Sequence, residues 1–308
     1  MKVILLNENI IYVDYLESYL DIANDKIPKI IRKILYKILN KIGRVNQDKN
    51  LVKMICQEND NINKKMINNL IEKIKKLNLK NIVLPEILNN NSQFISILKE
   101  DGYNILDGRW LYKFLAYDIV EKIAYVKNVK ISDMEITILS NADSDINIEI
   151  IKELAQKCKI LNIVTDKINM FQAVENFLFD EYGINITVSR NKQKTCLHSD
   201  LVLNLDFKNN LLKKCKLKKK SILVQFTKEK FENKNGATIV FYKMNMPVKY
   251  SRNIENNGHF SEEILYESFL YYKTSYINIR KILEKDNFEI RYFIGNNGKI
   301  PFQELKTT

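Results

Sequence analysis

Glycine, proline and histidine are scarce in this sequence, which has 8 glycines, 4 prolines and 2 histidines among 308 residues. Phosphate-binding loops need several glycines in one short turn, because only bare backbone approaches a phosphate closely. No segment of the chain offers such a turn. Two histidines cannot form a histidine-rich metal site, and we expect no bound metal. Neither His198 nor His259 lies beside a nucleophile in the sequence, so a hydrolytic triad has no support.

Paired cysteines and long apolar runs are also missing. The four cysteines, at positions 56, 158, 196 and 215, include no C-x-x-C pair, which excludes the common zinc motifs. Free thiols are typical of a reducing compartment. No run of 18 apolar residues exists, so we expect no membrane span. Polar residues at 7–9 interrupt the N-terminal apolar run, which predicts a strand and not a signal peptide. We therefore expect a cytoplasmic protein.

Positive charge is in excess, because 49 Lys and Arg residues face 37 Asp and Glu residues and give a formal net charge of +12. Such a surplus suits a nucleic acid or an anionic membrane surface. The competing interpretation is compositional, since Lys far outnumbers Arg, the residue that nucleic-acid readers favour. The densest run, 213–220, holds six lysines and no aromatic residue for base stacking. We expect an unidentified small molecule or protein as the partner, with nucleic acid as an alternative.

The first 127 residues predict an N-terminal α/β domain. We expect strands at 2–6, 81–84 and 103–106, and helices at 13–23, 27–42, 63–77, 92–99 and 110–125. Helices that alternate with short apolar strands are typical of a parallel sheet with helical layers. A polar stretch at 127–133 is the expected domain boundary.

The second half of the chain shows the same alternation more clearly. Apolar strands are expected at 135–139, 161–165, 184–188, 201–205, 221–226 and 237–242, with helices at 146–159 and 169–182. Short buried strands joined by helices predict a doubly wound, Rossmann-like parallel sheet. We therefore divide the chain into an N-terminal α/β domain at 1–127, a Rossmann-like domain at 133–250 and a C-terminal helical extension at 251–308.

Two short motifs carry a resemblance to a known family. Thr165-Asp166-Lys167 follows the second strand of the Rossmann-like domain, and Ser199–Asn204 leads into the fourth. In these motifs, residues 133 to about 245 resemble the NAD(P)-binding domain of the shikimate dehydrogenase and glutamyl-tRNA reductase type. The resemblance covers about a third of the chain and implies that Asp166 stands where that family reads the ribose. The family's catalytic Lys–Asp pair and its nucleophilic Cys have no counterpart, and the turn at 140–145 lacks the expected glycines.

Candidate site residues follow from the rule that doubly wound sheets bind ligands at the carboxyl ends of their strands. The rule gives five candidate cofactor-binding residues, which are Asn141, Asp145, Asp166, Ser189 and Asn204. Arg190, after the third strand, and Arg109, beside the only tryptophan, are candidate anion-binding residues. The structural alternatives are a helix cap for Asp143, Asp145 and Asp166, and a solvated loop for Arg190.

The missing glycines decide between the candidate functions. Side chains in the turn at 140–145 would block a pyrophosphate, and Asp143 and Asp145 would repel its charge. We therefore expect no cofactor, and a protein that binds a ligand or partner without transferring hydride. The alternatives are an NAD(P)-dependent oxidoreductase with an atypical phosphate turn, in which Asp166 would favour NAD, and a protein that binds nucleic acid or an anionic membrane through a basic face.

Overall fold

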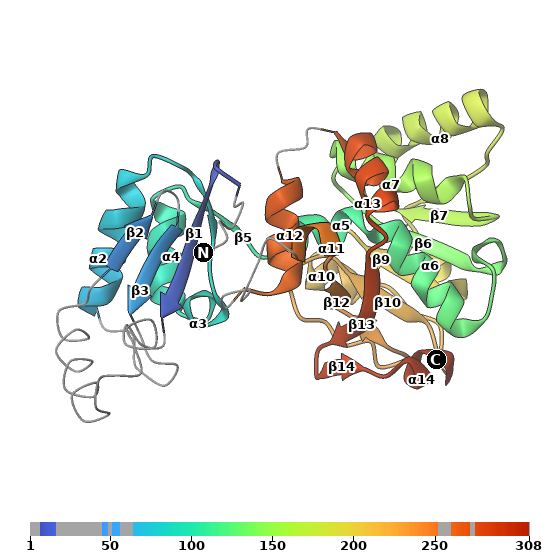
Figure 1. Ribbon diagram of the computed structural model, residues 1–308. Coiled ribbons are helices and arrows are strands. Elements are labelled where there is room, and N and C mark those ends of the chain that lie inside the picture. The colour runs from blue at the N-terminus through green and yellow to red at the C-terminus, as the bar shows by residue number, and fades with distance from the viewer. Residues whose placement is uncertain are drawn as a thin grey trace. The chain divides into compact units, whose positions relative to one another are not determined.

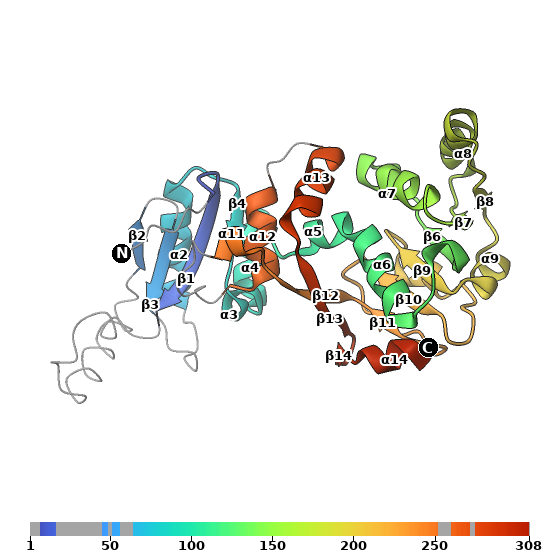
Figure 2. The same cartoon turned by 45° about the vertical axis from the view of Figure 1, so that its right-hand side comes forward.

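The computed structural model describes residues 7–16, 45–48, 51–55, 64–251, 260–271 and 275–307. The chain divides into two compact units (Figures 1 and 2), of which the first comprises Met1–Gly108 and Met246–Tyr272. The second comprises Arg109–Asn245 and Lys273–Thr308. This division does not coincide with the ranges 1–127, 133–250 and 251–308, because residues 109–127 belong to the second unit and the C-terminal residues are shared between both. The three ranges stay a prediction about folding domains.

The first unit contains a five-stranded sheet with the order β2-β3-β1-β4-β5. Its strands are β1 Ile10–Leu16, β2 Val45–Asp48, β3 Leu51–Ile55, β4 Asn81–Val83 and β5 Asn104–Leu106. Its helices are α2 Lys64–Lys76, α3 Glu86–Asn89, α4 Ser92–Glu100, α11 Val248–Ser251 and α12 Glu262–Leu270. All pairings are parallel except that of β2 with β3. The core lies between the sheet and the apolar faces of α2 and α4.

The start of the chain differs from its prediction. A helix was expected from residue 13, but Val13–Leu16 belong to β1, which pairs with β3 on one side and β4 on the other. Pairing on both edges and complete burial of Ile10–Val13 favour a central strand over the helical periodicity of the sequence. The β2–β3 hairpin was not predicted. The strand expected at 2–6 and the helix expected at 27–42 lie outside the described residues.

The second unit is built on a six-stranded sheet with the order β11-β10-β9-β6-β7-β8, in which every pairing is parallel. The strands are β6 Glu135–Leu139, β7 Ile160–Val164, β8 Thr187–Ser189, β9 Leu201–Asn204, β10 Ile222–Gln225 and β11 Thr238–Ile239. Numbered one to six along the chain and read from the β8 edge, they follow the order 3-2-1-4-5-6 of the Rossmann fold. The predicted fold class, α/β with a doubly wound, Rossmann-like parallel sheet, is confirmed.

Helices and a small antiparallel sheet complete the second unit. The helices are α5 Arg109–Phe114, α6 Ala116–Lys127, α7 Asp145–Ala155, α8 Ile168–Tyr182, α9 Lys192–His198, α10 Asn209–Leu212, α13 Tyr276–Asp286 and α14 Phe302–Thr307, with a short 3-10 turn at Ile131–Asp133. The small sheet consists of β12 Phe241–Asn245, β13 Glu289–Gly295 and β14 Gly298–Ile300. The C-terminal residues are therefore not only helical, because β13 pairs with β12.

Candidate functional site

The strand order of the second unit reverses between β6 and β9. From β6 the chain proceeds to β7 on one side, and from β9 it proceeds to β10 on the other. The two strands are parallel neighbours, with Leu139 opposite Asn204, so their carboxyl ends meet at one edge of the sheet. Ligands of doubly wound folds bind at this point, where the diverging connections leave a crevice.

An internal carboxylate occupies the turn that follows β6. The amide N–H of Asn141 donates to Asp206 Oδ1 at 2.7 Å, and that of Ala142 donates to Asp206 Oδ2 at 3.0 Å. Ser140 Oγ and Asn147 Nδ2 donate to the same Oδ2, at 2.7 and 3.0 Å. Asp206 thus accepts backbone and side-chain donors at the place where a dinucleotide-binding fold holds the pyrophosphate.

Asn204 shapes the loop that carries Asp206. Its side chain is fully buried, and both ends of its amide bond the backbone of Phe207. Nδ2 donates to the Phe207 carbonyl at 3.0 Å, and Oδ1 accepts from the Phe207 amide at 2.8 Å. These bonds close a turn immediately after β9 and thereby position Asp206 between its ends. Asn204, a predicted cofactor residue, lies at the expected strand end, where its own polar atoms are used by the protein.

The start of α7 is capped by Ser144, whose Oγ accepts from the Asn147 amide at 3.4 Å. Asp143 and Asp145 are both exposed, and Asp145 is the first residue of the helix. The capping alternative is therefore wrong for both aspartates. An acidic residue in the first turn still interacts favourably with the helix dipole, which accounts for Asp145 without a ligand.

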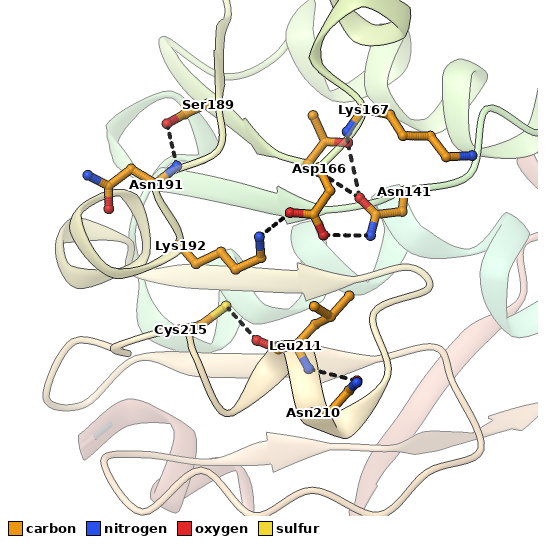
Figure 3. Close-up of polar contacts among 10 residues, drawn as sticks. Asn141, Asp166, Lys167, Ser189, Asn191, Lys192, Asn210, Leu211 and Cys215 are labelled. Atoms are coloured by element: carbon orange, nitrogen blue, oxygen red, sulfur yellow. Dashed lines mark hydrogen bonds and ion pairs between the residues drawn. The ribbon is translucent and has the colours of Figure 1, made fainter.

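Asn141 links the carboxyl ends of β6 and β7 (Figure 3). Its Oδ1 accepts from the Asp166 amide at 2.7 Å and from Thr165 Oγ1 at 3.2 Å. Its Nδ2 donates to Asp166 Oδ2 at 3.2 Å. The ammonium group of Lys192, from the start of α9, pairs with the other oxygen of Asp166. The predicted residues Asn141 and Asp166 are thus brought together, and Lys192 joins them.

Asp166 carries its charge against a cation. The hydrogen bond from Lys192 holds the pKa of Asp166 below its usual range. The Asp166 side chain is 44% exposed, whereas that of Lys192 is only 13% exposed. Lys167, not Asp166, precedes α8 as its capping residue, so the capping alternative is wrong here too. A ribose hydroxyl at this position would have to share the Asp166 carboxylate with Lys192.

The other predicted residues lie at or beside the ends of other elements of the same unit. Ser189 ends β8, and its Oγ accepts from the Asn191 amide at 2.9 Å. Arg190 follows it and is exposed. Arg109 begins α5, donates to the Thr227 carbonyl at 3.3 Å, and its guanidinium carbon lies 5.6 Å from the centre of the Phe241 ring. Whether either arginine binds an anion stays a prediction.

Two thiols lie close together beside this network. Cys196 is buried in α9, and Cys215, which follows α10, packs against the same apolar cluster. The neighbouring Cys196 thiol lowers the pKa of Cys215, and the charge of Lys192 lowers it further. Burial raises the pKa of Cys158 to about 12. Cys56 lies outside the described residues.

Sequence reasoning missed Asp206, which organises the turn. The available signal was its position: it is an acid two residues beyond Asn204, at the end of a strand that borders the reversal of strand order. Over the residues that the structure describes, no group of three or more His, Cys, Asp or Glu side chains could hold a metal ion. No helix within these residues combines the length and the apolar character that a bilayer-crossing segment needs.

No protein-family model and no curated protein sequence matches this chain. Among solved structures, L-tryptophan dehydrogenase from Nostoc punctiforme is 10% identical with a TM-score of 0.33, over 90% of this chain and 87% of that chain. Shikimate dehydrogenase in complex with NADP+ is 12% identical with a TM-score of 0.32, over 89% and 99%. Ornithine carbamoyltransferase from Pyrococcus furiosus is 8% identical with a TM-score of 0.31, over 87% and 85%. Likenesses at these scores carry no argument about family or activity, so the Rossmann assignment rests on the strand order of the chain itself.

Proposed function

We propose that this chain binds a ligand or a partner on a Rossmann sheet and does not transfer hydride. The observation that carries the proposal is the Asp206 carboxylate, which accepts the amides of Asn141 and Ala142 at 2.7 and 3.0 Å. These amides belong to the turn in which a dinucleotide-binding fold holds its pyrophosphate. A pyrophosphate would have to displace a carboxylate of its own sign of charge and take over all of its donors.

Energetics oppose that displacement. Besides the two amides, Ser140 and Asn147 also donate to Asp206, so the carboxylate is held by four hydrogen bonds. Hydrogen bonds to a charged group contribute about 1.5–3 kcal/mol each, and a displaced carboxylate beside a phosphate adds repulsion. The turn is therefore already occupied by an anion that is part of the protein.

Isothermal titration calorimetry with NAD+, NADH, NADP+ and NADPH tests the proposal. We expect none of the four dinucleotides to bind to the wild-type protein at about 1 mM, and weak binding of NAD+ only after Asp206→Asn removes the charge. Asp200→Asn is the matched control, because Asp200 also accepts a backbone amide, that of Glu135 at 3.0 Å, but at the other end of the sheet. Micromolar binding of any dinucleotide to the wild-type protein would overturn the proposal.

The alternative of an NAD(P)-dependent oxidoreductase is favoured by the position of Asp166. This carboxylate follows β7, the strand whose end reads the ribose in a Rossmann fold, and its side chain is 44% exposed. The alternative predicts that Asp166→Ala weakens NAD binding and abolishes the preference for NAD over NADP. Unchanged affinity and unchanged preference in that variant would eliminate it.

A further inference from the structure

A cavity of about 860 Å³ opens in the second unit beside the Asp166 network. One wall is the connection from β9 to β10, and the other is the segment that precedes β11. The first wall contributes Lys213, Lys214 and Lys216, and the second contributes Lys230 and Lys234. Glu232 is the one carboxylate in the lining. The fold thus gathers five ammonium groups from two segments around one hollow, which we call the lysine-lined cavity.

These five positive charges are not held in ion pairs, although Glu232 shares the lining and the charge of Lys214 also acts on Asp166. All five lysines are exposed, and none of them forms an ion pair with any residue in the described part of the chain. Their neighbours behave differently: Lys192 pairs with Asp166, and Lys218 pairs with Asp200 at 2.6 Å. Like charges that converge on one hollow raise its positive potential and attract anions.

Hydrogen bonds between the two walls hold the walls together against this repulsion. Asn235 Nδ2 donates to the Leu217 carbonyl at 2.8 Å, and Asn209 Nδ2 donates to the Lys230 carbonyl at 3.0 Å. The Asn209 amide also donates to Glu229 Oε2 at 2.6 Å. Each bond joins one wall to the other. The lysines are therefore presented by a preformed frame, and a ligand would not have to pay for assembling it.

The size and chemistry of the cavity select its ligand. A volume of 860 Å³ falls in the range of about 300–1,000 Å³ that is typical of small-molecule sites. Lysine ammonium groups are compact point charges suited to phosphate oxygens. The one aromatic side chain in the lining, Phe231, packs against the apolar cluster that contains Cys196 and is engaged there. Single-stranded nucleic acids need aromatic faces for stacking, so a small ligand fits better than a strand.

We propose that the lysine-lined cavity binds a small molecule that carries several phosphate groups. This site is separate from the turn held by Asp206, and its occupation requires no nicotinamide. The shared chemistry is the phosphate chain, which an inorganic polyphosphate or a nucleoside triphosphate could supply. Five lysines, against the one carboxylate of Glu232, can neutralise most of the charge of such a chain.

Calorimetry with inorganic tripolyphosphate, ATP and a 12-nucleotide single-stranded RNA, at about 50 mM salt, tests the inference. We expect tripolyphosphate to bind with a micromolar Kd, and Lys213→Gln with Lys230→Gln, one from each wall, to weaken it about tenfold. The matched control is Lys281→Gln with Lys285→Gln, two exposed lysines of α13 outside the cavity, and it should change the Kd less than twofold. Thermal unfolding of both double variants verifies that they are folded.

Three results would overturn the inference. One is the absence of tripolyphosphate binding to the wild-type protein, and another is an equal loss in the control pair, which would mean general surface charge. The third is RNA binding more tightly than tripolyphosphate, which would assign the lysines to a nucleic acid. Equal affinities for ATP and tripolyphosphate would support recognition of the phosphate chain alone, and tighter ATP binding would support a nucleotide. None of these results depends on whether Asp206 excludes dinucleotides.

Discussion

The turn after β6 and the lysine-lined cavity differ in whether their charged groups have partners within the protein, although the chain that follows β9 contributes to both. In the turn, one carboxylate meets four donors of the protein itself. In the cavity, five ammonium groups converge without a carboxylate paired to any of them among the described residues. A charged group that is hydrogen-bonded or ion-paired within the protein stabilises the fold. A charged group without an ion-pair partner is available to a ligand. The comparison assigns a structural role to the first region and a binding role to the second.

The cluster around Arg280 shows charged groups that are paired within the protein. The Arg280 side chain is 9% exposed; it pairs with Asp118 and, at 3.0 Å, with Glu153. Tyr276 Oη also donates to Glu153, at 2.6 Å. The cluster joins α6, α7 and α13, which come from distant parts of the sequence. Its carboxylates depend on Arg280 for compensation.

The largest effect is therefore expected from Arg280→Met. The variant keeps much of the side-chain volume but leaves the partly buried carboxylates of Asp118 and Glu153, 20% and 22% exposed, without their cation. We expect a cost of about 3 kcal/mol, the low end of the range for buried ion pairs. Urea unfolding at pH 7 measures this loss in the free energy of unfolding. Lys281→Met, at the neighbouring exposed position of α13, is the control and should change it by less than about 0.5 kcal/mol. Equal effects of the two substitutions would show that the cluster does not act as a unit.

A smaller loss is expected from Asp206→Ala. The substitution leaves the amides of Asn141 and Ala142 without their acceptor, whereas Ser140 and Asn147 keep the Ala142 carbonyl as theirs. The two partly buried amides without a partner cost about 1–3 kcal/mol in total after water enters. Asp143→Ala, in the same turn but exposed, should be nearly neutral. Urea unfolding of both variants compares them directly. If Asp206→Ala is as mild as Asp143→Ala, the turn does not need its internal anion.

The sequence predicted the sheet of the second unit well because that information is local. Apolar runs such as Glu135–Leu139 are short, buried on both faces and bounded by polar turns, which is enough to indicate parallel strands. Val13–Leu16 were misassigned because strand pairing on both sides, which the local pattern does not contain, decided their conformation. Strand order depends equally on long-range pairing, and no order of the strands was predicted from the sequence.

The sequence predicted where in the sheet the candidate site lies, but it did not predict all of the residues that form it. The rule about strand ends found Asn141 and Asp166, which lie in contact. It did not find Asp206, because its role depends on amides 64 and 65 residues earlier in the chain. The lysine run at 213–220 was visible, but its separation into cavity lysines and Lys218, which pairs with Asp200, required the folded structure.

Cysteine reactivity provides a kinetic test of the effect that Cys196 and Lys192 have on Cys215. Cys215 lines the cavity, and its pKa is lowered by the Cys196 thiol and by Lys192, whereas burial raises the pKa of Cys158 to about 12. Both thiols are half-buried, so thiolate content decides their rates. We expect iodoacetamide to modify Cys215 at least about tenfold faster than Cys158 near pH 8, as measured by peptide mass spectrometry. Cys196→Ala should slow the reaction of Cys215 by removing the thiol that lowers its pKa, and equal rates for Cys158 and Cys215 would contradict the assignment.

The smallest effect concerns Asp166, whose partner Lys192 borders both regions. Because the folded-state pKa of Asp166 lies below the ordinary pKa of an aspartate, its contribution to stability is present above that ordinary pKa and is lost as the pH falls through the folded-state pKa. The side chain is 44% exposed, so the contribution is less than about 1 kcal/mol. Asp166→Asn should therefore reduce the difference in unfolding free energy between about pH 7 and pH 3, while Asp143→Asn leaves it unchanged.

If Asp166→Asn leaves the difference in unfolding free energy between about pH 7 and pH 3 unchanged, Asp166 does not neutralise Lys192. Lys192 would then resemble the cavity lysines, which have no ion-pair partner. Lys192 would then be unpaired in solution and would add a sixth positive charge beside the lysine-lined cavity. In that case Lys192→Gln should weaken tripolyphosphate binding as each cavity lysine does, by up to about fivefold. If the ion pair with Asp166 persists, Lys192→Gln should weaken tripolyphosphate binding less than twofold, because the carboxylate already neutralises the ammonium group.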